Sequence, residues 1–401
     1  MSSKGRTTDL KRKKIVWLSF IPATYLNITA DLEILKPLGE RYDVYLVGPY
    51  LSIRQQLKNP KIHLTSIPIE SRPRALIPSI ALNTILFLFF PFYIITLKPD
   101  FIIVKTDGTV FGFLSTLFLN RCLGTRGSKV ILDIRSTPVE TVKFPFTFRF
   151  TVSVAKRVFD GITIITSLMK NDICKKLGID QNFVGVWSVG ASTTLFDPDK
   201  YSLQGTFLKK KLGLLDRFVV LYHGSISPRR GLIESVDAFP TVVDRHPEIV
   251  LFILGKGYAE GNLKKLIEEK KIETNVIIHG AVDYVEVPKY IAMCDVGIVP
   301  LPNISYWRHQ CPLKLLEYLA MKKPVIITDI PAHREIVQDK ECGIYISSSA
   351  PTEITNAIIY AYENKERLSE WGASGREIIV KKYNWEKAAE SLEKYLLSLK
   401  N

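Results

Sequence analysis

Residues 217–255, RFVVLYHGSISPRRGLIESVDAFPTVVDRHPEIVLFILG, decide the fold class of this chain. An apolar run of strand length at 217–224 precedes a segment with helical spacing at 231–245, and a second apolar run follows at 248–255. Continuous apolar runs separated by a helix of this length are typical of parallel strands that are covered on both faces. The stretch therefore predicts a βαβ unit of an α/β fold.

The same alternation continues on both sides of this unit. Downstream, we expect strands at 275–280, 296–301, 324–329 and 343–347, with helices at 260–270, 286–292 and 313–321. Upstream, we expect strands at 14–20, 43–49, 62–69, 101–105, 129–134 and 161–167, with helices near 30–39, 109–121 and 146–159. Two such series predict two tandem Rossmann-like, doubly wound domains that face each other across a cleft.

The two series are separated by VWSVGASTTLFDPDK (186–200), which has neither helical nor strand periodicity. We place the boundary near residue 195. The expected units are residues 1–195 and residues 196–375. The amphipathic run at 376–401 is expected to return to the first domain, because its apolar face needs a surface to pack against.

Composition excludes several classes of protein. With 401 residues, of which 46% are hydrophobic, the chain is long enough for two cores and is not globally disordered. The five cysteines lie far apart with no CxxC pair, which argues against a disulfide framework or a zinc site and favours a cytoplasmic location. The start MSSKGRTTDLKRKKIVWLSFIPA imitates a signal peptide, but IVWLSF is better explained as a buried first strand.

Positive charge is concentrated in the first half of the chain. The net charge is +14, and residues 1–195 carry 26 Lys and Arg against 13 Asp and Glu. Residues 75–97, ALIPSIALNTILFLFFPFYIITL, carry no charge and permit three interpretations: an apolar helical face resting on a membrane, a buried helix, or a membrane span. We expect the first, because this segment lies between two predicted strands of one sheet.

The membrane interpretation has consequences for partners. The segment FPFTFRFTVSVAKRVF (144–159) also mixes Phe with Arg and Lys, as interfacial helices do. We expect Phe87, Phe89 and Phe90 to reach the lipid and the protein to bind peripherally to the anionic cytoplasmic face of a membrane. Nucleic acid is a poorer partner, because the aromatic residues cluster in apolar runs rather than among basic ones.

The loop HGSISPRRGL (223–232) follows the first strand of the second series. Gly224 permits a close backbone approach, Ser225 offers a hydroxyl group, and Arg229 and Arg230 precede a helix. Guanidinium groups beside the free N–H groups of a helix start suit a diphosphate. In HQCPLKLLEYLAMKKPVIITD (309–329), Glu317 lies near a helix start among apolar neighbours. A buried carboxylate there could accept hydrogen bonds from the vicinal hydroxyls of a ribose.

Several segments, in order, resemble the second half of the retaining glycosyltransferases of family 4, which have the two-domain GT-B fold. These segments are YHGSISPRRGL (222–232), LFILGKG (251–257), NVIIHGAVDYVEVPKYIAMCDVGIVPL (275–301), PLKLLEYLAMKKPVI (312–326) and AHREIVQDKECGIYI (332–346). The resemblance implies that residues 196–375 bind a nucleotide-sugar donor and that residues 1–195, which face the membrane, bind the acceptor. It implies no cofactor or metal. It also implies transfer of a hexose or N-acetylhexosamine, with retention, to a lipid-linked or surface-glycan acceptor.

Site residues can be carried over at matching positions. The resemblance makes Arg230 the cation for the donor diphosphate and Glu317 the ribose-binding second acid of the Glu-x7-Glu pair, and it places Val282 near the base. The first acid of that pair falls at His309, and a donor-phosphate Arg falls at Ser225, for which Arg229 could compensate. Gly224, Gly255 and Lys314 complete the expected donor-binding set.

Catalytic candidates lie in the first half. ILDIRSTPVE (131–140) resembles the strand and loop that carry catalytic-site residues in the family, which places Arg135 and Ser136 there. Asp133 and Asp107 are the nearest carboxylates at predicted strand ends. Retaining members are thought to use front-face displacement, in which the leaving phosphate helps to deprotonate the acceptor. Two alternatives stay open: a nucleotide-sugar epimerase of similar fold, and an inactive membrane-peripheral protein.

Overall fold

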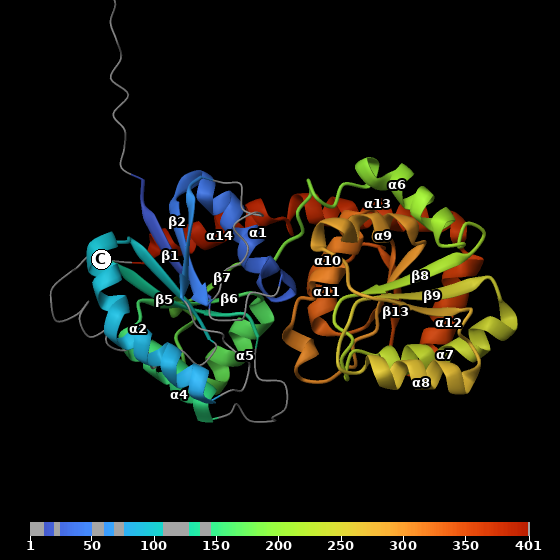
Figure 1. The fold of residues 1–401 in the computed structure, drawn as a ribbon, viewed down its shortest axis with the longest axis horizontal. Coiled ribbons are helices and arrows are strands. Elements are labelled where there is room, and N and C mark those ends of the chain that lie inside the picture. Colours follow the sequence, from blue (N-terminus) through green and yellow to red (C-terminus); the bar gives the residue numbers. More distant parts are fainter. Residues whose placement is uncertain are drawn as a thin grey trace, which may run out of the picture.

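The computed structural model describes residues 12–19, 25–49, 60–67, 76–106, 128–136 and 146–399. Two parallel sheets lie next to each other, each flanked by helices (Figure 1). The predicted architecture of two Rossmann-like α/β domains is confirmed.

The first sheet has the strand order β3-β2-β1-β4-β5-β6-β7. Its strands are β1 (Lys14–Leu18), β2 (Asp43–Pro49), β3 (Ile62–Ile67), β4 (Phe101–Lys105), β5 (Lys129–Ile134), β6 (Gly161–Ile164) and β7 (Val184–Val186). The order reverses at β1, and because crossovers between parallel strands are right-handed, the helices divide between the two faces. The helix α1 (Tyr25–Arg41) lies on one face, and α2 (Leu76–Leu97), α4 (Phe146–Val158) and α5 (Ser167–Leu177) cover the other (Figure 1).

The second sheet has the order β10-β9-β8-β11-β12-β13. Its strands are β8 (Phe218–His223), β9 (Ile249–Leu254), β10 (Val276–His279), β11 (Val296–Val299), β12 (Val325–Thr328) and β13 (Gly343–Ile346). Its helices are α7 (Leu232–Arg245), α8 (Glu260–Lys270), α9 (Val287–Met293), α10 (Leu313–Ala320), α11 (Pro331–Val337) and α12 (Pro351–Glu363). The order reverses at β8, so the loop after this strand lies at a switch point, where open α/β sheets bind ligands.

Two helices near the domain join escape sequence prediction. The strand expected at 161–167 stops at Ile164, because Thr166 accepts a hydrogen bond from the Met169 N–H and begins α5. Asp197 caps α6 (Pro198–Lys211) in the same way, with Pro198 in its first turn. Short polar capping residues are common in loops as well, so their presence alone does not predict a helix.

The chain closes with α13 (Leu368–Lys381) and α14 (Trp385–Ser398), and α14 lies against α1 and β7 of the first domain (Figure 1). The Tyr395 ring occupies the space that a Cβ on Gly161 or Gly185 would need. The Glu393 carboxylate accepts a hydrogen bond from the Tyr42 hydroxyl at 2.9 Å. The last helix thus completes the packing of the first sheet.

Candidate functional site

Two glycines shape the switch point of the second sheet. Gly224 has φ +116°, and a Cβ on it would lie 3.3 Å from the Lys314 Nζ. Gly255 has φ +157°, and a Cβ on it would lie 1.9 Å from the Gly224 carbonyl oxygen. Only glycine allows the loops after β8 and β9 to approach each other and α10 in this way.

Arg230 is held on the rim of this site. Its Nε donates to the Ser227 hydroxyl at 2.9 Å, and its guanidinium stacks 5.0 Å from the ring centroid of Trp307. The Trp307 Nε1 donates to the Arg229 carbonyl oxygen at 2.8 Å. Arg229 has a left-handed backbone with φ +62°, and its side chain is exposed. Ser225 is also exposed. The loop therefore orients Arg230, whereas Arg229 contributes its backbone.

Lys314 is the buried cation of the site. Its Nζ lies 3.4 Å from the centroid of the Tyr222 ring and has no hydrogen-bond partner among the described residues. Burial lowers the pKa of Lys314 well below its usual value, and the nearby positive charge of Arg230 lowers it further. Because buried polar groups normally have partners, the arrangement favours an anion that binds here and supplies one.

Glu317 lies one turn further along α10 and is also buried. The Tyr284 hydroxyl donates to its Oε1 at 2.9 Å, and the His223 Nε2 lies 3.3 Å from its Oε2. Burial raises the pKa of Glu317 to about 7, although the Tyr284 hydrogen bond opposes the shift. The structure therefore brings Gly224, Arg230, Lys314 and Glu317 to one place.

His309 and Val282 lie in neighbouring segments. His309 belongs to the short helix η3 (Trp307–His309), and its Nδ1 is 3.1 Å from the Ser305 carbonyl oxygen. Its own carbonyl oxygen accepts a hydrogen bond from Thr166 of the first domain at 2.8 Å. Val282 is half-buried after β10, two residues before Tyr284. Among the described residues, no side-chain hydrogen bond or ion pair joins His309 or Val282 to Glu317.

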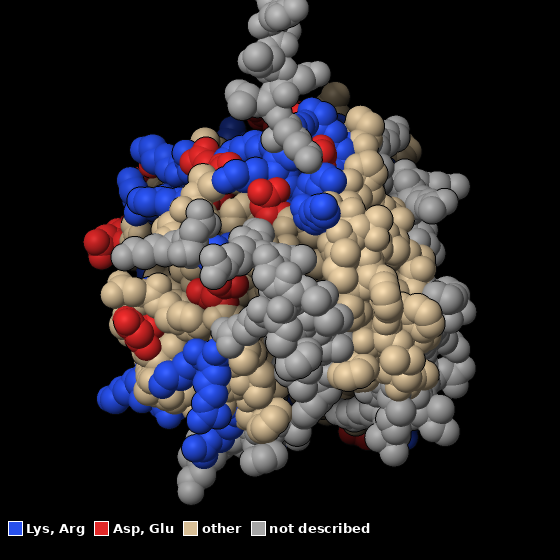
Figure 2. All heavy atoms as spheres, turned by 90° about the vertical axis from the view of Figure 1, so that its left-hand side faces the viewer, with Lys and Arg blue, Asp and Glu red and all other residues tan. Residues whose placement is uncertain are grey.

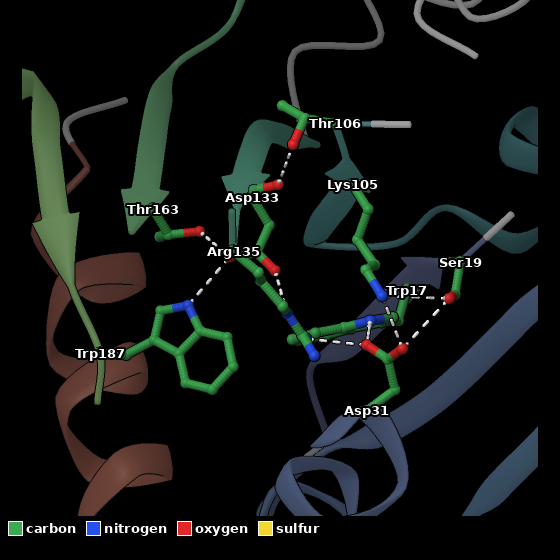
Figure 3. Close-up of polar contacts among 9 residues, drawn as sticks. All are labelled: Trp17, Ser19, Asp31, Lys105, Thr106, Asp133, Arg135, Thr163 and Trp187. Atoms are coloured by element: carbon green, nitrogen blue, oxygen red, sulfur yellow. Dashed lines mark hydrogen bonds and ion pairs between the residues drawn. The ribbon is translucent and has the colours of Figure 1, made fainter. Parts of the chain in front are cut away.

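In the first domain, Asp133 and Arg135 belong to a buried charge network at the carboxyl ends of the strands (Figure 3). The Asp133 Oδ1 accepts hydrogen bonds from Thr163 at 2.8 Å and from the Trp187 indole at 2.9 Å. Its Oδ2 accepts from the Arg135 Nε at 2.8 Å. Both carboxylate oxygens are engaged, so the contacts favour a role for Asp133 in orienting Arg135.

The other half of the network surrounds Asp31 of α1 (Figure 3). Its carboxylate pairs with an Arg135 terminal nitrogen and with the Lys105 Nζ, each at 2.8 Å. The Trp17 indole donates to it at 2.9 Å. Arg135 also lies over the Trp17 and Trp187 rings, at 5.2 and 4.8 Å from their centroids. Two carboxylates thus balance two cations.

Asp107 lies outside the described residues, whereas Ser136 is exposed next to Arg135. Sequence reasoning missed Asp31, Lys105 and Trp187 because they are far apart in the chain and belong to no motif. It also missed Tyr284, although this residue lies within a segment that carries the family resemblance.

The helix α2 presents an apolar face to the outside. Phe92 is 70% exposed, and Phe87, Leu88, Phe89 and Ile95 are also exposed, whereas Phe90 is only 5% exposed because it packs into the first core. The expectation that Phe90 reaches lipid is therefore wrong. Figure 2 turns this side toward the viewer and shows a broad area without charged side chains, bordered by Lys and Arg. Among the described residues, no helix has the length and apolar character that crossing a membrane requires.

The chain is similar in sequence to known glycosyltransferases. Residues 206–378 match the family model of glycosyl transferases group 1. The chain is 25% identical over 249 residues to the GDP-mannose-dependent alpha-(1-6)-phosphatidylinositol monomannoside mannosyltransferase of Mycobacterium tuberculosis, covering 61% of this chain and 64% of the relative. It is 21% identical to the alpha-D-kanosaminyltransferase of Streptomyces kanamyceticus, covering 59% of this chain and 60% of the relative. The matches thus span less than two thirds of these relatives.

Solved structures resemble the whole chain. The Anabaena HepE protein in complex with UDP and glucose has a TM-score of 0.77 at 15% identity and covers 97% of this chain and 100% of that chain. Sucrose-phosphate synthase of Thermosynechococcus elongatus has a TM-score of 0.75 at 17% identity and covers 97% of this chain and 99% of that chain. At these identities the likeness establishes the shared two-domain fold.

Proposed function

We propose, for a chain whose residues 206–378 form a glycosyl transferases group 1 domain, that it transfers a hexose or N-acetylhexosamine from a nucleotide sugar to a lipid-linked or surface-glycan acceptor. The observation that carries the proposal is the buried Lys314 amino group, which has no hydrogen-bond partner in the described part of the chain and lies near the buried carboxyl group of Glu317 at the sheet's switch point. A nucleoside diphosphate presents a matching anion and ribose. The two relatives from Mycobacterium tuberculosis and Streptomyces kanamyceticus are named as glycosyltransferases, which supports the same class.

The donor would be held by three side chains. Lys314 and Arg230 would bind the diphosphate, and the Glu317 carboxylate would accept hydrogen bonds from the ribose hydroxyls. The base would lie near Val282. Retention, as in family 4, would follow from front-face displacement. The acceptor oxygen bonds to the anomeric carbon while the bond to the phosphate oxygen breaks, and that oxygen takes the acceptor's proton. The two cations stabilise the charge that develops on the leaving diphosphate.

Donor hydrolysis tests the proposal directly. We expect the protein to release nucleoside diphosphate from one member of a panel of UDP-, GDP- and ADP-sugars. Arg230→Ala should lower this activity far more than Arg230→Lys, because lysine keeps the charge near the diphosphate. Activity on no member of the panel, or equal activity of the alanine variant and the parent, would count against the site.

Glu317→Ala should weaken nucleoside diphosphate binding by about 1–3 kcal/mol, because the ribose hydroxyls lose a charged acceptor. Calorimetry with the nucleotide of the active donor measures the effect. The matched control is Glu370→Ala, which removes an exposed glutamate of α13 and should leave the affinity unchanged. Unchanged affinity of Glu317→Ala would remove Glu317 from the ribose site.

We also propose that the apolar face of α2 rests on the anionic cytoplasmic surface of a membrane, where a lipid-linked acceptor is available. The supporting observations are the exposed Phe87, Phe89 and Phe92 and the exposed basic residues Arg149 and Lys156 on α4. Since right-handed crossovers place α2 and α4 on the same side of the sheet, apolar and basic side chains can meet one surface together. Each Lys or Arg near an anionic surface adds roughly 1 kcal/mol.

Replacing Phe87, Phe89 and Phe92 with Ser should lower the affinity of the protein for anionic vesicles at least about tenfold, because the rings no longer bury apolar surface in the membrane. Donor hydrolysis should persist, because the donor site lies in the other domain. Sedimentation with vesicles gives the bound fraction. The control replaces Leu203 and Phe207 of α6, which are 85% and 70% exposed, with Ser and should not change binding. An equal loss of vesicle binding in both variants would show that the α2 face is not a specific membrane-binding surface.

A further inference from the structure

His223 ends β8 beside the Glu317 carboxyl group. Its buried ring stands edge-on to the Tyr318 ring, with centroids 4.9 Å apart, and its Nε2 lies 3.3 Å from the Glu317 Oε2. Its backbone N–H donates to the Tyr318 hydroxyl at 3.1 Å, which in turn donates to the Leu221 carbonyl oxygen at 2.7 Å. The strand and α10 therefore hold this imidazole beside the carboxyl group. Among the described residues the buried Nε2 makes no hydrogen bond, and the Glu317 Oε2 at 3.3 Å is a polar atom within its reach.

Other titratable groups surround the pair. Lys314 of α10 acts on both members of the pair, and Tyr284 of the helix η2 (Tyr284–Glu286) and Glu33 of α1 act on Glu317. Arg230 of the loop after β8 acts on Lys314, and Tyr222 of β8 acts on Tyr318, whose ring faces His223. Burial lowers the pKa of His223 well below its usual value, and Lys314 lowers it further. Because burial raises the pKa of Glu317 to about 7, the carboxyl group and not the imidazole changes charge near neutral pH.

We propose that His223 is a positioning residue of the donor site. Its Nε2 and the Glu317 carboxyl group exchange the roles of hydrogen-bond donor and acceptor, and this exchange determines the affinity of the site for the nucleotide's ribose. The inference rests on the proposed function. When Glu317 is ionised, the Nε2–H donates to its Oε2. When Glu317 is protonated, its O–H donates to Nε2 and the imidazole carries its proton on Nδ1.

The charge state of Glu317 decides which form binds the ribose well. Ribose hydroxyls donate more strongly to a carboxylate than to a carboxylic acid. Affinity for the nucleoside part should therefore be full above the titration midpoint and fall by up to about tenfold per pH unit below it. Loss of the Nε2 donor should make the carboxylate harder to form and move the midpoint to higher pH.

The first arm of the test uses the ligand-free protein. Imidazole ¹⁵N shifts distinguish the two tautomers, and the His223 signals are identified by their absence in His223→Gln. We expect the Nε2 tautomer to change with a midpoint near neutral pH in the parent and to stay fixed in Glu317→Gln. A single tautomer in the parent from about pH 5.5 to about pH 9 would overturn the inference.

The second arm measures binding of UDP, GDP and pyrophosphate across the same pH range. The ratio of nucleotide to pyrophosphate affinity cancels the protonation of Lys314. His223→Phe should raise the midpoint of this ratio by about one pH unit while retaining affinity at high pH, and His223→Gln, which keeps an N–H donor, should restore it. An equal loss at every pH would mean a purely structural role. Nucleotides that bind no more tightly than pyrophosphate would overturn the proposed ribose site, a result that the first arm cannot produce.

Discussion

Asp31→Ala should lower the free energy of unfolding by about 3–5 kcal/mol, because it leaves Lys105 and Arg135 buried without their shared carboxylate. Both cations lie 2.8 Å from the Asp31 carboxylate, and both side chains are too buried for water to replace this carboxylate as their partner. Thermal and urea unfolding of the parent and the variant measure the difference. The matched control is Asp172→Ala, which breaks an exposed pair with Lys176 on α5 and should change stability by less than about 1 kcal/mol.

The contribution of Asp31 should depend on pH. Burial alone would raise the pKa of Asp31, but the charges of Arg135 and Lys105 outweigh it and hold the pKa below its ordinary value. The stabilisation is therefore complete above the unfolded-state pKa of about 4 and disappears as the pH falls through the folded-state pKa. A loss smaller than that of the surface control at neutral pH would mean that the network contributes no net stability.

Lys314→Met should weaken diphosphate binding by about 1.5–3 kcal/mol and at the same time stabilise the free protein. In the unfolded chain Lys314 is protonated, but burial lowers its pKa in the folded state. The lysine therefore reduces the stability of the folded protein at neutral pH, and methionine removes this cost. The gain in stability should be present at neutral pH and vanish above about pH 10, where lysine is neutral in both states.

Two measurements on the same variant decide this prediction. Calorimetry gives the affinities for UDP and for pyrophosphate, and thermal unfolding gives the stability. Lys256→Met, which removes an exposed lysine after β9, is the control and should change neither quantity. A variant that is destabilised and still binds pyrophosphate would show that Lys314 packs the core rather than serving an anion.

Much of the fold is predictable because parallel strands leave a strong local signal. The strand expected at 248–255 is found at Ile249–Leu254, and the helix expected at 75–97 is found at Leu76–Leu97. In α2, however, nearly every residue is apolar, so periodicity cannot tell which side is buried. The structure assigns Phe90 to the core and Phe89 to the surface, and this choice depends on the sheet beneath the helix.

The candidate site is predictable only where its residues are close in sequence. Arg230 lies in one loop, and Lys314 and Glu317 share a helix, so their types and spacing are informative. The partners of these groups come from distant segments: His223 and Tyr284 reach Glu317 from a strand end and a short helix. Asp31 meets Arg135 only because the carboxyl ends of β1 and β5 lie at the same edge of the first sheet, which brings α1 and the residues after β5 together there. Such contacts follow from topology rather than from local pattern.

The packing of Tyr395 against Gly161 and Gly185 has a consequence for biosynthesis. The ribosome makes the strands β6 and β7 about 200 residues before it makes α14, an interval of roughly 10–40 s at ordinary elongation rates. Because the Tyr395 side chain covers Gly161 and Gly185, the first sheet can complete its packing only after the last helix of the chain has been synthesised.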